Sequence, residues 1–467
     1  MEQDNLFTDV AEFGQGSADA LVKTLMAGVG ADAAQFTGGR ALMPESCETT
    51  LVNVMREMQD DFKLMNTIKK TPVHSTVHQF NIRDDVGDAD MGFVPEGGVT
   101  PTNLQSIKRQ VVEMAFIQKL GAITQQLLQA TTFEDALEVE KVAVTLSVLK
   151  TAEKYCFHGD KLVVPRQYDG FPALIKNTDA NLRNVYDIRG RTIGQEGEGI
   201  FTRMAEMIYD RGGEANKVFY PIILGSDIQD LARDRFRFNT ADFSMGTVFN
   251  EYPTIYGTLK IAREAGPNKL YFPKNKVKQT DSKNAPNRPA SVALAREANA
   301  AGSQFLAADA GMIHYLVHAV NEYGISEGTE ATSSVAAAAG DAIRITITPS
   351  AVNPGTGFII SRTRAGQPVE TAMEMVRIPA GTGATTVYVD KNEDLPGTAE
   401  MLFITEKRIA PIAEFYQLSP MQMFRMPPPS DRLIVPFIMA LWGAPNLKAP
   451  HWCGLVKNIG YAGGLYG

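Results

Sequence analysis

Two short pairs of cysteine and histidine are the residues of this chain best suited to bind a metal. Cys156 and His158 are two positions apart, and so are His451 and Cys453. Structural zinc sites commonly combine two such pairs with a recognisable spacing. Here more than half of the chain separates the pairs, and nothing in the sequence brings them together. The sequence therefore predicts buried thiols, with no metal ion and no cofactor.

An acidic cluster could also hold a cation; it consists of Asp84, Asp85, Asp88, Asp90 and Glu96. A helix-loop-helix calcium site needs oxygen ligands at positions 1, 3, 5 and 12. Counted from Asp88, position 5 is a glycine and position 12 is a valine, so the calcium pattern fails. The cluster is then either a solvated loop tip or a charged contact with another subunit. The basic partners that we expect for such a contact are Arg233, Arg235 and Arg237.

Motifs of nucleotide binding and of nucleophilic catalysis are absent from the sequence. The glycine-rich run at residues 194–199 contains Glu196 and Glu198, whose charges would repel a phosphate. No Gly-x-Ser-x-Gly or His-Glu-x-x-His motif occurs. No catalytic residue is therefore predicted. The alternative of an enzyme would have to use side chains outside any motif, such as Asp227, Arg233, His451 and Cys453.

Length and composition describe an ordinary folded chain. The 467 residues are 44% apolar and 21% charged, and 45 basic against 53 acidic side chains give a net charge of −8. This balance argues against a surface built to neutralise phosphates. No apolar run reaches about 18 residues, so no membrane-spanning helix is expected. The acidic start is unlike a secretory signal, and the three cysteines are expected to be reduced thiols.

The elements predicted around the acidic cluster are long and simple. Residues 73–82 and 108–118 are β-rich and flank a Gly/Asp/Pro segment, which predicts an extended hairpin. A two-stranded ribbon is marginally stable alone in water, so this hairpin should pack on something else. Residues 132–158 predict a helix roughly 37 Å long, with Thr132 as its N-cap.

An α/β layer is predicted after this helix. Residues 168–175 predict a turn leading into a strand, residues 198–211 a helix, and residues 217–224 a buried strand. A helix capped by Ser226 is expected to follow. Past a Lys/Asn/Pro-rich stretch, short alternating runs such as residues 342–348 predict a β-sandwich of roughly 115 residues. From residue 399 the α/β pattern returns, so the sandwich is an insertion.

This order of elements resembles the major capsid proteins of tailed bacteriophages, which have the HK97 fold. The resemblance implies an α+β fold whose parts are an N-terminal arm (1–45), a peripheral domain (46–72 and 119–190) with its spine helix (132–158), an extended hairpin loop (73–118), an axial domain with closing peripheral strands (191–285 and 403–467), and an inserted sandwich (286–402). Within the insertion, residues 315–326 resemble a strand and turn of a fibronectin type III or immunoglobulin-like module. The sandwich has no disulfide and no core tryptophan of the usual kind.

The resemblance also implies a function. It implies a non-enzymatic structural protein that self-assembles into the hexamers and pentamers of an icosahedral phage head around double-stranded DNA. The expected partners are further copies of the chain, a scaffolding protein, a portal and cement proteins, with no membrane and no specific DNA binding. The expected location is the virion, assembled in the host cytoplasm, with the inserted sandwich on the outer surface. The alternatives are a nanocompartment shell protein of the same fold and an immunoglobulin-like adhesion or binding protein.

Overall fold

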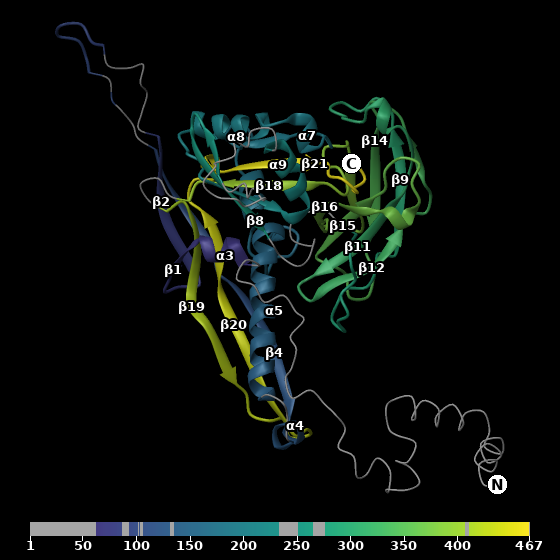
Figure 1. The fold of residues 1–467 in the computed structure, drawn as a ribbon. Helices are drawn as coiled ribbons and strands as arrows, with labels where there is room; N and C mark the ends of the chain where they lie inside the picture. Colours follow the sequence, from purple (N-terminus) through teal and green to yellow (C-terminus); the bar gives the residue numbers. More distant parts are fainter. Residues whose placement is uncertain are drawn as a thin grey trace, which may run out of the picture. The chain divides into compact units, whose positions relative to one another are not determined.

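The computed structural model describes residues 62–85, 93–100, 102, 106–130, 135–232, 251–264, 276–406 and 411–466. The chain divides into two compact units, and nearly all described residues belong to the unit formed by Met55–Gln129 and Leu137–Gly467. This unit combines helices with several β-sheets (Figure 1), so the predicted α+β class is confirmed.

One sheet of this unit joins strands from both ends of the described chain. Its order is β1-β19-β20-β4, with β1 parallel to β19 and the other neighbours antiparallel. The strands are β1 (Lys69–Pro72), β4 (Ala115–Thr124), β19 (Ala413–Arg425) and β20 (Ile434–Leu447). The short helices α3 (Lys63–Thr67) and α4 (Gln125–Gln129) flank β1 and β4 in the sequence. Lys119 on β4 donates to the backbone oxygen of Ser147, which fixes a long helix beside the sheet.

That long helix is α5 (Ala136–His158), and it runs alongside β4 and β20 in Figure 1. The long helix predicted from the sequence is thus present, although Thr132, its expected N-cap, lies outside the described residues. Val148, Ala152 and Cys156 form a fully buried stripe. The helix ends at His158 and is followed by Gly159, where a Cβ would lie 2.4 Å from the carbonyl oxygens of Tyr155 and Tyr168. Only glycine permits so close an approach of two backbones.

The predicted hairpin is formed by β2 (Val77–Asp85) and β3 (Ser106–Glu113), which pair antiparallel. The expected second arm extended to residue 118, but the chain beyond Glu113 passes into β4 of the larger sheet.

A six-stranded sheet carries the α/β layer, in the order β5-β21-β18-β6-β8-β7. Its strands are β5 (Val185–Asp187), β6 (Lys217–Pro221), β7 (Glu251–Thr254), β8 (Gly257–Glu264), β18 (Ala399–Ile404) and β21 (Gly454–Ile459). Its helices are α7 (Ile193–Glu196), α8 (Gly199–Asp210) and α9 (Gly225–Ala232). Apolar side chains of α8, including Phe201 and Met204, pack against this sheet in one core. The predicted helix at 198–211 is confirmed. The strand predicted at 217–224 is present as β6 but ends at Pro221, and Ile222–Leu224 form a 3-10 helix instead.

Two local predictions are wrong. Residues 168–175 do not enter a strand, because Phe171–Lys176 form the helix α6, with Gly170 as N-cap and Pro172 in its first turn. Proline is well tolerated at that place, since its missing N–H would have no helical partner there. Ser226 is not an N-cap either, because α9 already begins at Gly225.

The insertion is a β-sandwich. One sheet has the order β12-β11-β15-β16 and the other β17-β14-β9, with a small β10-β13 pair beside them. The strands are β9 (Ser291–Glu297), β10 (Gly311–Ile313), β11 (Tyr315–Asn321), β12 (Gly324–Glu330), β13 (Val335–Ala337), β14 (Ala342–Thr348), β15 (Gly357–Arg362), β16 (Met373–Pro379) and β17 (Thr386–Asp390). Ile343, Ile345 and Ile347 are fully buried between the sheets, as their alternation predicts.

Candidate subunit interface

The structure tests few of the predicted contact residues. Asp84 and Asp85 lie on β2, and their side chains are outside the described set. Glu96 is exposed in a turn closed by the Gly98 N–H and the Pro95 carbonyl, 2.8 Å apart. The remaining residues lie outside the described residues: Asp88, Asp90, Arg233, Arg235 and Arg237. The charged contact between subunits stays a prediction.

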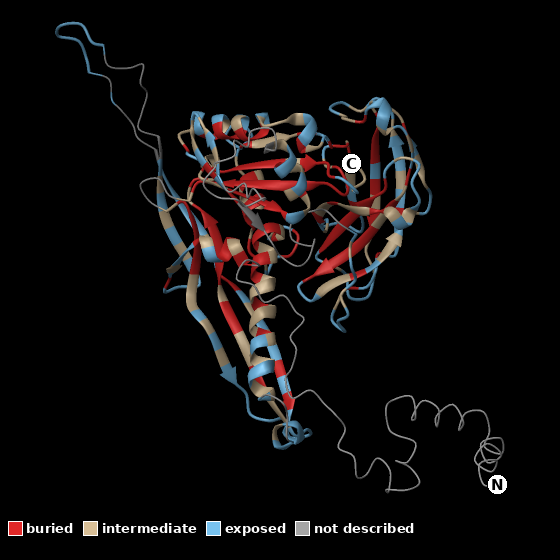
Figure 2. Cartoon of the chain, viewed as in Figure 1, coloured by how far each residue is buried: buried red, intermediate tan, exposed pale blue. Residues whose placement is uncertain are grey.

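The hairpin exposes apolar side chains instead. Val77, Val111 and Ile107 are exposed, and the β2–β3 register places them on one face of the ribbon. The opposite face contacts the rest of the unit, where the His78 ring lies 4.6 Å from the ring of Tyr416 on β19. Figure 2 shows β2 and β3 as largely exposed or intermediate strands. The exposed face is mixed, because the same register places polar and charged residues such as Arg83 and Arg109 beside the three apolar side chains. A two-stranded ribbon with one covered face and exposed apolar side chains on the other has a surface on which another chain can bury area.

Near the hairpin tip, Phe93 and Val99 are fully exposed on either side of the turn that contains Glu96. Apolar side chains that gather at one exposed place can contribute to a contact with another chain. The apolar residues of this tip therefore offer a contact that the sequence argument, centred on its charges, missed. Their signal in the sequence was apolar residues inside a Gly/Pro-rich segment.

A second bare apolar surface lies on the sheet that carries β4. Phe116 and Trp442 face each other in the β4–β20 register, with ring centroids 5.9 Å apart. Phe424 of β19 stacks on the same Trp442, also at 5.9 Å. Phe116, Phe424 and their neighbour Leu120 are all exposed. These residues form the second face on which another chain could bury area.

A trough of about 900 Å³ separates the base of the hairpin from the body of the unit. Its walls come from β3, from the loop after α5 and from the end of β20, and include Lys108, Tyr168 and Asn446. Two ion pairs lie at this trough, Lys161 with Glu113 and Lys448 with Glu414. The trough is therefore lined by a mixture of apolar and charged side chains, and the two ion pairs lie at its sides.

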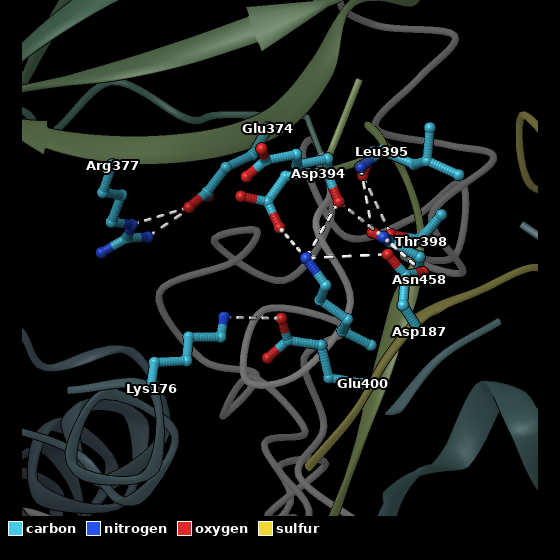
Figure 3. A network of polar contacts seen from close by, with 11 residues as sticks. Lys176, Asp187, Glu374, Arg377, Asp394, Leu395, Thr398, Glu400 and Asn458 are labelled. Carbon is cyan, nitrogen blue, oxygen red and sulfur yellow. Dashed lines mark hydrogen bonds and ion pairs between the residues drawn. The ribbon is translucent and has the colours of Figure 1, made fainter. Parts of the chain in front are cut away.

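The segment that leads out of the sandwich is held by a polar network (Figure 3). Lys457 Nζ donates to the carbonyl of Glu393 at 3.0 Å, and Asn458 Nδ2 donates to the same carbonyl at 2.9 Å. The Asn458 side-chain oxygen accepts the Leu395 N–H at 2.9 Å. In the same view, Lys176 of α6 pairs with Glu400 of β18 at 3.1 Å. Burial would lower the pKa of Lys176, but the carboxylates of Glu400 and Asp394 hold it above its usual value.

The sandwich and α5 meet at His158. The pKa of His158 is lowered to about 4, chiefly by burial and also by the positive charges of Arg377 and Lys154. Glu374 and Glu400 oppose this shift. Arg377 and Glu374 pair at 2.6 Å on β16, as Figure 3 shows. Around this point Val163 and Val164 pack on Val320 and Ile359 of the sandwich.

The cysteine and histidine pairs do not form a metal site in the described part of the chain. Among the described residues, no group of three His, Cys, Asp or Glu side chains could hold a metal ion. Cys156 Sγ lies 3.8 Å from Met65 Sδ in the core, and burial raises the pKa of the Cys453 thiol to about 12. Both thiols are therefore buried, and the raised pKa keeps the Cys453 thiol protonated at neutral pH. No described helix is long and apolar enough to cross a membrane.

Known proteins similar to this chain are phage capsid proteins. The major capsid protein of Staphylococcus phage K is 23% identical over 434 residues, which are 88% of this chain and 88% of that protein. The putative major capsid protein of Enterococcus phage phiEF24C is 22% identical over 456 residues, covering 91% of this chain and 94% of that protein. No family model matches the sequence. These relatives confirm the predicted resemblance to phage major capsid proteins.

Solved structures show a weaker likeness. The capsid of a native GTA particle has a TM-score of 0.44 at 11% identity, covering 91% of this chain and 98% of that chain. A chain from Mycobacterium phage Adephagia has a TM-score of 0.45 at 7% identity, covering 90% and 95%.

Proposed function

We propose that this chain is the major capsid protein of a phage, and that its copies assemble into the hexamers and pentamers of an icosahedral head around double-stranded DNA. The single observation that carries this proposal is the similarity to phage major capsid proteins along about nine-tenths of the chain. The role is structural rather than enzymatic.

Exposed apolar side chains on two surfaces support the proposal that copies of this chain assemble. Stable subunit interfaces bury on the order of 1,200–2,000 Å², and obligate ones bury more. The hairpin face with Val111 and Ile107 and the sheet face with Phe116 and Phe424 offer area that a monomer would leave in water. A segment of a neighbouring copy fits the trough beside the hairpin. The acidic cluster at residues 84–96 remains our proposed charged contact with Arg233, Arg235 and Arg237 of a neighbour.

The further partners follow from the same role. They are a scaffolding protein, a portal and cement proteins, with assembly in the host cytoplasm and the virion as destination. The net charge of −8 suits a wall that encloses DNA without binding it specifically. We place the inserted sandwich on the outer surface.

Microscopy and sedimentation test the proposal directly. The full chain is expressed alone and together with its neighbouring genes, and negative-stain images are compared with sedimentation profiles. Closed shells, or regular hexamers and pentamers, are expected. A monomer under both conditions would contradict the proposal, and shells that enclose a host enzyme instead of DNA would favour a nanocompartment.

A variant with Asp84, Asp85 and Asp88 replaced by Ala tests the charged contact. We expect weaker assembly and a smaller dependence of assembly on salt, because surface charge pairs are screened by ions. Assembly with an unchanged salt response would remove this contact from the proposal.

A further inference from the structure

The last described residues of the chain lie against the inserted sandwich. The carbonyl of Leu465 accepts a hydrogen bond from Arg364 of the sandwich at 2.8 Å. The guanidinium carbon of Arg364 lies 5.4 Å from the centroid of the Tyr466 ring. Arg364 lies two residues after the end of β15, whereas Leu465 and Tyr466 lie after β21 of the six-stranded sheet. Contacts at the C-terminus thus join two different sheets.

Tyr466 also approaches a buried charge cluster inside the sandwich. Arg362 is 2% exposed, and it pairs with Asp390 and with the side-chain oxygen of Asn392, each at 2.6 Å. Tyr315 donates its hydroxyl to the same Asp390 at 2.7 Å. Burial raises the pKa of Tyr466, and the nearby guanidinium of Arg362 opposes that rise. The C-terminal ring therefore covers the end of the sandwich where its charges are buried.

The segment leaving the sandwich is packed under the same C-terminal residues. Gly397 has a φ of +63°, and a Cβ there would lie 2.5 Å from Met373 Sδ and 3.2 Å from Leu465 Cδ1. The tyrosine ring comes equally close to Gly190 on the other side, 3.1 Å from the position of a Cβ. Leu465 and Tyr466 are thus packed between the sandwich, its exit segment and the loop that follows β5 of the six-stranded sheet.

We propose that residues 461–466 act as a clasp that fixes the inserted sandwich to the six-stranded sheet. A domain inserted in a loop is covalently joined at two points. This sandwich also packs through Val320 and Ile359 on Val163 and Val164. The clasp adds a further attachment on the side of the six-stranded sheet, formed by the Arg364 hydrogen bond and the Tyr466 ring. The sandwich then moves with the capsid subunit as one body.

Amide hydrogen exchange of the full-length protein tests the clasp. The variants are Tyr466→Ala, Arg364→Ala and a chain truncated after Tyr461. We expect exchange in the exit segment 393–398 and in residues 363–372 to accelerate on the order of tenfold, while β14 keeps its protection. Arg344→Ala is the matched control, because it removes another exposed sandwich arginine, one that pairs with Glu297 far from the clasp.

Two results would overturn the proposal. Unchanged exchange at residues 393–398 in the truncated chain would show that the sandwich is held without the C-terminus. An equal acceleration at β14 would show that the C-terminal residues support the whole sandwich rather than its attachment. Tyr466→Phe keeps the ring and should leave the exchange within about twofold of the parent chain.

Discussion

The carboxylate of Glu153 accepts the backbone N–H of Leu64 at 3.0 Å, and its second oxygen accepts the N–H of Met65 at 3.1 Å. These N–H groups belong to the first turn of α3, whose N-cap residue Phe62 provides no side-chain cap. A helix start leaves its first N–H groups without helical partners. Glu153, fully buried on α5, therefore caps a helix from a distant part of the sequence.

Replacing Glu153 by Ala should lower the free energy of unfolding by about 3 kcal/mol, because two buried N–H groups lose a charged acceptor. Urea denaturation of the unassembled subunit measures this loss. Glu138→Ala is the control, since Glu138 is exposed on the same helix. Equal stabilities of the two variants would contradict the capping role.

Replacement of two glycines by alanine should change the stability of the subunit in opposite directions. Gly159→Ala places a Cβ against two carbonyl oxygens and should destabilise the subunit by roughly 3 kcal/mol or cause misfolding. Gly199→Ala, at the first residue of α8, meets no atom within 4 Å and should stabilise by about 0.5–1 kcal/mol. Thermal unfolding of both variants checks the difference, and a stable Gly159→Ala protein would show that the α5 end can relax.

Acid should destabilise the subunit through His158. Its folded pKa of about 4 is below the ordinary value of 6.5, so the unfolded chain binds the proton more readily. The stability contribution of neutral His158 is therefore complete above pH 6.5 and is lost as the pH falls toward 4, by up to about 3 kcal/mol.

Urea midpoints at pH 7 and pH 4.5 measure this loss in the parent chain and in His158→Gln, which cannot bind the proton. The variant should lose less stability between the two pH values. The matched control is His74→Gln, because His74 is exposed. The same pH dependence in all three proteins would exclude His158 as the cause.

Substitutions on the exposed face of the hairpin should reduce assembly of the subunits without changing the stability of the fold. Ile107→Asp and Val111→Asp change exposed side chains, so the stability of the subunit should change by less than about 0.5 kcal/mol. Shell yield should fall severalfold, since a buried unpaired carboxylate is costly at an interface. Val352→Asp, at an exposed position of the sandwich, is the control. Normal shells from both hairpin variants would place the interface elsewhere.

The sequence predicted elements well where one pattern dominated. The hairpin, α5, α8 and the alternating β14 followed from periodicity, because each buries one face or stripe. It failed at α6, where the apolar run of residues 171–175 is too short to separate a strand from a helix. The expected end of the sandwich, residue 402, falls inside β18, since an apolar strand looks alike in either sheet.

The candidate interface was only partly predictable. Charges at residues 84–96 drew attention to the tip, but the exposure of Phe116, Leu120 and Phe424 depends on which side of the sheet α5 covers. That choice is made by contacts between distant segments, such as Lys119 with Ser147. The clasp could not be predicted from the sequence either, because its contact joins Arg364 and Leu465, which are 101 positions apart.

The pairing of β4 with β20 has a consequence for synthesis on the ribosome. The strand β4 cannot form its hydrogen bonds with β20 until residues 434–443 have been synthesised. At roughly 5–20 residues per second, the ribosome needs about 15–60 s to make the intervening chain. The sandwich, whose paired strands all lie between Ser291 and Asp390, can fold within that delay. Newly made chains therefore expose an open β4 edge for many seconds, and a chaperone that shields it should raise the yield of competent subunits.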